Sequence, residues 1–179
     1  DSVSGNITGT VYPEIPTQTP QIVNFTNETV ALVTFSDAVF YSGKGNNLNN
    51  YVRTADKVNL SGVSSANLTF STRFDTEVNF DFAYVKVSND GSAWNTLATY
   101  NKTQASWTTK NISLNGYLGQ QVYISFNYTT DGSVVKEGFF FNNILVNTSA
   151  GTRFTDDLEN GTVKWLVSNF SIKNDTFEQ

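Results

Sequence analysis

The chain has 179 residues and a formal net charge of −5, with 39% hydrophobic and only 15% charged residues. This length suits one domain with its own core, or one domain with a tail. Lys and Arg form no cluster that would neutralise phosphates, which excludes a nucleic-acid reader, and no apolar run approaches the ~18 residues of a membrane-spanning helix. Because the chain contains no His and no Cys, it has no Ser-His triad, no imidazole or thiolate metal site and no disulfide.

The first twenty residues differ from the rest of the chain. The stretch "DSVSGNITGTVY" shows a modest alternation of apolar and polar residues, which predicts a strand over 2–12. The stretch "PEIPTQTP" holds all three prolines of the chain and predicts an extended linker. We therefore expect two parts, a tail with its linker over 1–20 and a head domain over 21–179. A disordered N-terminus is the alternative.

The head domain shows strand patterns and no helical periodicity. The sequence "NDG" at 89–91 predicts a hairpin turn. Many strands, short turns and two apolar faces favour an all-β, antiparallel β-sandwich. If Asn127 faces outward, the inward residues of its strand are Val122, Ile124, Phe126 and Tyr128. The alternating or β-branched runs that predict strands lie at 29–35, 66–72, 78–88, 121–129, 138–146 and 162–172.

Motifs for N-linked glycosylation, N-x-S/T, are unusually frequent. With 22 Asn and 40 Ser or Thr among 179 residues, chance gives about five such motifs, and the chain has twelve. In seven of them the middle residue is apolar, so on a strand the apolar side chain would face inward and the glycan outward. An Asn- and Thr-rich β protein also makes such motifs by accident. The acceptor residues are Asn6, Asn24, Asn27, Asn59, Asn67, Asn101, Asn111, Asn127, Asn147, Asn160, Asn169 and Asn174.

These motifs indicate an extracellular protein that carries covalent N-linked glycans. No signal peptide is visible, so we expect the sequence to be the mature part of a secreted chain.

From about Phe40 onward the sequence resembles a known family. The matching segments are "FYSGKGNNLNN", "VNLSGVSSANLTFSTRFDTEVNFDFAYVKVSNDGSAWNTLATY", "SWTTKNISLNGYLGQQVYISFNYTTDGSVVKEGFFFNNILV" and "FTDDLENGTVKWLVSNFSIKND". They resemble the accessory β-sandwich of the secreted bacterial immune inhibitor A metallopeptidases, a domain related to the MAM jelly rolls. The resemblance implies a MAM-like jelly roll without catalytic activity, because the peptidase motif H-E-x-x-H needs His.

The same resemblance implies a calcium site. The family usually carries Asp where this chain has the Asn pairs 46–47 and 142–143, and those Asp residues look like calcium ligands. An amide oxygen can bind calcium but brings no charge. No other cofactor is expected, and the alternative is a hydrogen-bonded Asn cluster that has replaced the metal. By resemblance the candidate ligands are Asp75, Glu77, Asp81 and Asn142.

Two groups of acidic residues invite comparison with the paired carboxylates of glycosidases. They are Asp75 with Glu77, and Asp156 with Asp157 and Glu159. Such groups are far more often solvated or directed at a metal than catalytic, so we expect that the chain is not an enzyme.

The tail and the proline linker suggest a structural function. A tail strand can complete the sheet of a neighbouring copy, as in donor-strand complementation, and head-to-tail repetition gives an open polymer. The architecture resembles the thread-type, pilus-like surface filaments of archaea. We therefore hypothesise a subunit of an adhesive extracellular filament at the cell surface, whose partners are other copies of itself and cellular or abiotic surfaces. The donor-strand residues would be Ile7, Gly9, Val11 and Tyr12.

The alternative is a secreted accessory module that recognises a glycan or a protein, with calcium as a possible cofactor. That module would present Trp side chains to a ligand. The candidates are Trp94, Trp107 and Trp165, although in a sandwich of this size Trp is more often part of the core or its rim.

Overall fold

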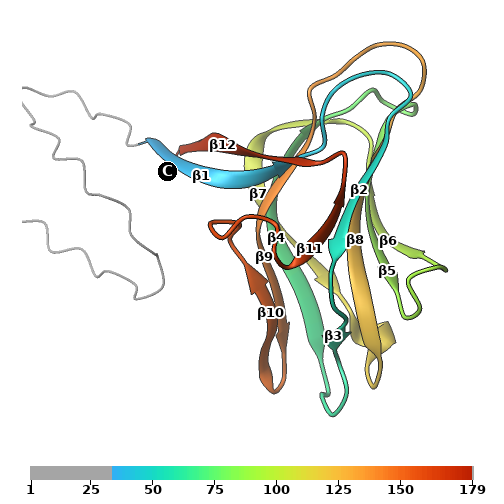
Figure 1. Ribbon diagram of the computed structural model, residues 1–179, viewed down its shortest axis with the longest axis vertical. Coiled ribbons are helices and arrows are strands. Elements are labelled where there is room, and N and C mark those ends of the chain that lie inside the picture. Colours follow the sequence, from blue (N-terminus) through green and yellow to red (C-terminus); the bar gives the residue numbers. More distant parts are fainter. Residues whose placement is uncertain (1–33, 179) are drawn as a thin grey trace, which may run out of the picture. The chain divides into compact units, whose positions relative to one another are not determined.

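The structure is a computed structural model that describes residues 34–178 of the chain. Figure 1 shows these residues as two antiparallel β-sheets that pack against each other. The predicted all-β, antiparallel sandwich is therefore confirmed. The tail and linker predicted over 1–20 and the sequons at Asn6, Asn24 and Asn27 lie outside the described residues.

The first sheet has the strand order β12-β1-β9-β4-β7, and β10 also pairs with β9. Its central strand β9 is flanked by β4 along most of its length and by β1 at Phe140 and Phe141. The strands are β1 (Thr34–Tyr41), β4 (Ala66–Asp75), β7 (Thr103–Ser113), β9 (Gly138–Thr148), β10 (Gly151–Asp156) and β12 (Ser171–Glu178).

The second sheet has the strand order β11-β2-β8-β5-β6, and β3 also pairs with β8. Within the described residues the single helix is the 3₁₀ turn Asn115–Tyr117, and no helix is long and apolar enough to cross a membrane. The strands are β2 (Asn49–Thr54), β3 (Val58–Asn59), β5 (Phe82–Ser88), β6 (Asn95–Tyr100), β8 (Gln121–Thr129) and β11 (Trp165–Ser168).

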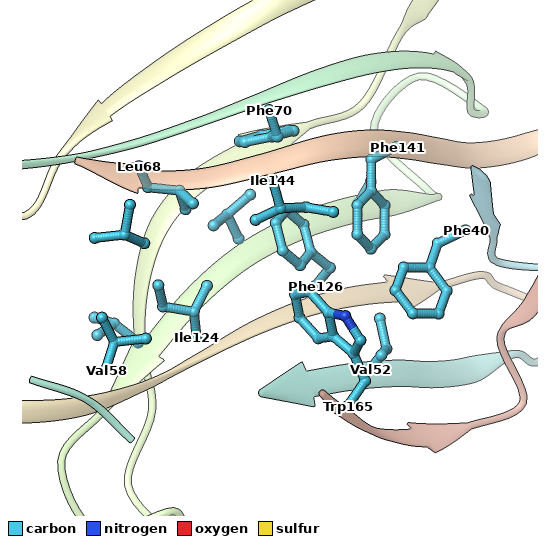
Figure 2. Close-up of a cluster of buried hydrophobic side chains, with 14 of the residues drawn as sticks. Phe40, Val52, Val58, Leu68, Phe70, Ile124, Phe126, Phe141, Ile144 and Trp165 are labelled. Atoms are coloured by element: carbon cyan, nitrogen blue, oxygen red, sulfur yellow. The ribbon is translucent and has the colours of Figure 1, made fainter. Parts of the chain in front are cut away.

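Aromatic side chains from both sheets fill the space between them. Figure 2 shows Phe40, Phe126, Phe141 and Trp165 pointing toward one another there. The rings of Phe126 and Phe141 stack with centroids 4.0 Å apart, and the rings of Phe40 and Trp165 meet edge to face with centroids 5.4 Å apart. Burying one such side chain stabilises the fold by about 1.5–3 kcal/mol, so this cluster is the main support of a chain without disulfides.

The alternation of apolar and polar residues predicted the buried face correctly on strands that bury one face and expose the other. Strand β8 has the predicted bounds, and Val122, Ile124, Phe126 and Tyr128 are all buried while Asn127 is not. Strands β4 and β9 contain the predicted runs 66–72 and 138–146.

Two predicted strands were wrong in their bounds. The run 78–88 becomes a strand only from Phe82, because residues 76–81 form a loop closed by the bond from the Asp81 amide to the Glu77 carbonyl. The run 162–172 is divided between β11 and β12 at Asn169, whose φ of 61° is left-handed and ends a strand.

Candidate functional site

Three carboxylates meet at one end of the sandwich. Glu77 and Asp81 lie on the loop between β4 and β5, and Asp131 lies on the loop between β8 and β9. One oxygen of each side chain lies within 4.8 Å of the others. In Figure 1 the loops after β1 and β8 run side by side at this end, so the cluster belongs to a group of neighbouring loops.

Asp81 holds the cluster together. It is 1% exposed, and its two oxygens accept backbone hydrogen bonds from Asp131 at 3.2 Å and from Glu77 at 3.4 Å. Burial and the charges of Asp131 and Asp81 raise the pKa of Glu77. Its Oε2 atom is buried and has no hydrogen-bond partner among residues 34–178.

The donor set suits a hard divalent cation. Calcium prefers six to eight oxygen ligands, several of them anionic, and an unpartnered buried carboxylate oxygen is suited to such a ligand role. Glu77, Asp81 and Asp131 would hold the ion, and it would neutralise the repulsion among them. Calcium binding stays a prediction.

Of the four candidate ligands that the resemblance implied, the structure brings two into the cluster. Glu77 and Asp81 are in the cluster, but Asp131, in the sequence "TTDGS" at the end of β8, was missed. Asp75 accepts a hydrogen bond from Thr103 Oγ1 at 2.6 Å instead. Asn142 is buried farther along the sheet, opposite Ser71, and donates to Asp37 at 3.2 Å.

The Asn pair at 46–47 fastens the loop that carries Asp131. The Asn47 amide donates to the Asp131 carbonyl at 2.6 Å, and Asn46 Nδ2 donates to the Gly132 carbonyl at 3.0 Å. Asn47 adopts a φ of 56°, which Asn tolerates better than most residues. These two bonds therefore position the loop that carries Asp131.

A second feature is an open hollow on the outer face of the second sheet. Its volume is about 280 Å³. Tyr51 is 40% exposed at its rim and Trp94 is half-buried, while Ser125 at 2% exposure lies deepest. The lining residues are Tyr51 and Arg53 from β2, Lys86 from β5, Ser125 and Asn127 from β8, and Gly91 and Trp94 from the loop between β5 and β6.

The three Trp residues have different environments. Trp165 is 4% exposed in the core, where its Nε1 donates to Asp156 at 2.5 Å. Trp107 is half-buried and packs on the outer face of the first sheet against the cluster of Val39, Tyr41 and Phe140. Of the three, only Trp94 lines the hollow.

The second acidic group has structural partners. Asp156 is buried, accepts from Trp165 and pairs with Lys164 at 3.4 Å. Glu159 accepts a backbone hydrogen bond from Ala38 at 3.3 Å and shares a side-chain hydrogen bond with Asp37. These contacts leave Asp156 and Glu159 poorly placed to act as a free acid and base.

None of the nine sequon residues within the described range is buried. Six are exposed and three are half-buried. Leu60, Leu68, Tyr128 and Phe170, which follow four of them, are buried, as the alternation requires. Glycosylation itself stays a prediction. The exposed six are Asn59, Asn111, Asn147, Asn160, Asn169 and Asn174, and the half-buried three are Asn67, Asn101 and Asn127.

The curated relatives that match this chain include three proteins of bacteria. Immune inhibitor A of Bacillus thuringiensis subsp. alesti is 27% identical over 79% of the chain and 22% of its own length. Pre-pro-metalloprotease PrtV of Vibrio cholerae is 25% identical over 78% of the chain and 16% of its own length. Bacillopeptidase F of Bacillus subtilis is 35% identical over 47% of the chain and 6% of its own length. The chain therefore spans less than a quarter of each relative.

A family model extends the resemblance toward the N-terminus. It describes the MAM domain of immune inhibitor A-like proteins and matches residues 16–175. The match thus begins within the predicted linker, and it covers both sheets, the hollow and the acidic cluster. The chain belongs to the immune inhibitor A-like MAM domain family.

Proposed function

We propose that the chain is a non-catalytic recognition module of an extracellular protein and that it binds a glycan in the hollow of the second sheet. The observation that carries the proposal is the pair of accessible aromatic rings, Tyr51 and Trp94, beside a polar floor. Sugar rings stack their C–H faces on such rings, and polar side chains between them bind the hydroxyl groups.

An accessory function agrees with the relatives. Their names describe an immune inhibitor, a peptidase and a metalloprotease, and the matched part is a small share of each. The H-E-x-x-H chemistry requires His, and this chain has none. We infer that catalysis, where it accompanies such a module, is performed by other parts of the protein.

Calcium would support this module from the end of the sandwich. An ion held by Glu77, Asp81 and Asp131 would cross-link the loop after β4 to the loop after β8. Strand β8 runs from the hollow to this end, so ordering its loop would also steady Asn127.

The filament hypothesis depends on the tail at 2–12, which lies outside the described residues. No described residue favours a polymer over a module, whereas the hollow favours a module. We therefore prefer the module.

The test is glycan binding by the full chain, produced without N-glycosylation so that Asn127 carries no sugar of its own. Binding to a glycan array should fall at least tenfold in Tyr51→Ala and Trp94→Ala, because each loses a stacking surface. Phe80→Ala is the matched control, since Phe80 is 56% exposed on the acidic loop and lies outside the hollow.

Two results would contradict the proposal. One is a chain that binds no glycan. The other is binding that fails in Phe80→Ala but survives in Tyr51→Ala, which would move the recognition surface to the loop end. The exposed apolar residues Val78, Val134 and Val135 also lie there.

A further inference from the structure

We propose that the ligand of the hollow is an acidic saccharide, whose anionic group lies between Arg53 and Lys86. This inference rests on the proposed function and specifies the ligand class. It follows from the strand register, from the charges that line the hollow and from the lack of a carboxylate among the described residues that line it.

The hollow is built from two neighbouring cross-strand rows. In one row Ser125 of β8 pairs with Arg53 of β2 on one side and with Lys86 of β5 on the other. Adjacent strands lie about 4.8 Å apart, so the two cationic residues start roughly 10 Å apart across a small serine. The short side chain of Ser125 between the long side chains of Arg53 and Lys86 leaves the hollow open, and the two cations form opposite walls of it.

The second row supplies the stacking surface. Two residues along the strands, Asn127 pairs with Tyr51 on one side and with Tyr84 on the other. The rows are separated by roughly 7 Å, which is about the span of a sugar ring with its substituent. A ring stacked at Tyr51 would thus place a substituent near the cationic row.

Both cations are held in place without being neutralised. The Arg53 guanidinium lies 4.6 Å from the centre of the Tyr123 ring, and its Nη1 donates to the Thr54 carbonyl at 3.2 Å. The Lys86 ammonium lies 4.7 Å from the centre of the Tyr84 ring. Across the part of the chain that the structure describes, neither cation forms an ion pair with a carboxylate.

Arg73, on the outer face of the first sheet, shows what a structural cation looks like in this protein. It pairs with Asp175 at 2.6 Å and with Glu137 at 3.0 Å, and it covers the Phe140 ring at 3.7 Å. Arg53 and Lys86 differ from Arg73 in facing one hollow without a carboxylate partner among the described residues. They complement an anion, and a guanidinium can bind a carboxylate or sulfate through two N–H groups.

The experiment compares acidic saccharides with neutral forms of the same backbone, using the full chain without glycosylation. Polygalacturonate, alginate and hyaluronan provide carboxylates, and heparin adds sulfates. Methyl-esterified polygalacturonate and carboxyl-reduced hyaluronan have the same backbones without the carboxylate charge. We expect at least one acidic polymer to bind about tenfold more tightly than its neutral form, and the binding to weaken as salt is raised.

The variants assign that charge preference to the hollow. Arg53→Gln and Lys86→Gln should each lower the affinity for the acidic form about tenfold and lower the affinity for the neutral form by a smaller factor. Lys102→Gln, an exposed lysine outside the hollow, changes the net charge equally and should have no effect. Equal unfolding temperatures would show that the variants are folded.

The outcomes separate the two proposals. Equal affinity for the acidic and neutral forms, lost in Tyr51→Ala, would overturn the acidic ligand and keep the glycan module. If Lys102→Gln lost as much affinity as Arg53→Gln, the assignment of anion binding to the hollow would be overturned, because such a loss indicates a non-specific charge effect. Binding to no saccharide would overturn both. Binding to carboxylated polymers or to heparin alone supports the inference and identifies the anion.

Discussion

Gly138 begins β9 with a φ of 104°, and a Cβ built there would lie 2.5 Å from the Gly43 carbonyl oxygen and 2.7 Å from Ser42 Oγ. Ser42 Oγ also accepts the Phe139 amide at 2.9 Å, so the close approach fixes where β1 leaves the sheet and its loop begins. This one residue therefore sets the path of the loop that holds the β8–β9 loop in place.

Gly138→Ala should lower the free energy of unfolding by about 2–4 kcal/mol, through the backbone clash and the left-handed φ together. Gly62→Ala is the matched control, because Gly62 has a φ of 71° but no atom within 4 Å of its Cβ. Urea denaturation should show a loss of only about 1 kcal/mol there. Equal losses in the two variants would mean that the close approach at Gly138 contributes nothing.

A second residue makes stability depend on pH. Burial, and then the hydrogen bond and charge of Glu159, raise the pKa of Asp37 to about 6, with a smaller effect of Asp157 and an opposing one of Asn142. The folded state therefore binds this proton more tightly than the unfolded state. Stability from the bound proton is present in full below the unfolded pKa of about 4, and it is lost as pH rises through 6.

Thermal denaturation of the wild type should thus show a lower unfolding temperature at pH 7 than at pH 5. Asp37→Asn should reduce that difference, because the amide keeps the contact with Glu159 and does not titrate. Glu77 also has a raised pKa and contributes in the same direction. The quantity to compare is therefore the change in unfolding temperature with pH, in the wild type and in Asp37→Asn. If Asp37→Asn kept the slope of the wild type, the coupling of Asp37 to Glu159 would be disproved. Asp75→Asn serves as the control.

At the scale of the elements, the loops at the end of the sandwich are joined by the acidic cluster. Calcium at 1 mM should raise the unfolding temperature by several degrees relative to chelator, as expected for a concentration about 100-fold above Kd. Asp131→Asn and Glu77→Gln should abolish that increase. Asp75→Asn should keep it, since Asp75 is hydrogen-bonded to Thr103 outside the cluster. If the unfolding temperature of the wild type did not change at 10 mM calcium, the cluster would be a group of mutually repelling carboxylates that binds no calcium.

Strands were predictable from the sequence where one face is buried and the other is exposed to solvent. The inward residues of β8 alternate with polar ones, so its bounds and its buried face were both predicted correctly. The division between β11 and β12 was not, because Asn169 interrupts an apolar run by its backbone conformation and not by its polarity. Alternation reports burial, and it carries no information on a single left-handed residue.

The hollow could not be predicted in the same way. Arg53, Lys86 and Ser125 lie far apart in the sequence and become neighbours only through the pairing of β2 and β5 with β8. Register decides which outward side chains share a row, and outward positions leave the weakest sequence pattern. Asp131 was missed for a related reason, since a loop after one strand meets a loop after another only in the folded sandwich.

At the scale of the whole molecule, the hollow and the acidic cluster lie on different surfaces of one sandwich. The cluster joins loops at one end, whereas the hollow opens on the outer face of the second sheet. The described residues that form the two features all lie between 51 and 131, so deletion of the tail removes none of them. This independence gives the module and filament hypotheses opposite expectations for the removal of the tail.

The module predicts that a chain lacking residues 1–12 binds glycans as the full chain does, and that both sediment as monomers. The reason is that all the residues of the hollow, from Tyr51 to Asn127, remain. Analytical ultracentrifugation and electron microscopy of glycosylated protein check the assembly state, and the glycan titration checks the site. Filaments of the full chain that disappear with the tail would instead establish donor-strand assembly through Ile7, Gly9, Val11 and Tyr12. Because the truncated chain keeps every described residue that lines the hollow, glycan binding by it would then be a second property of the filament subunit.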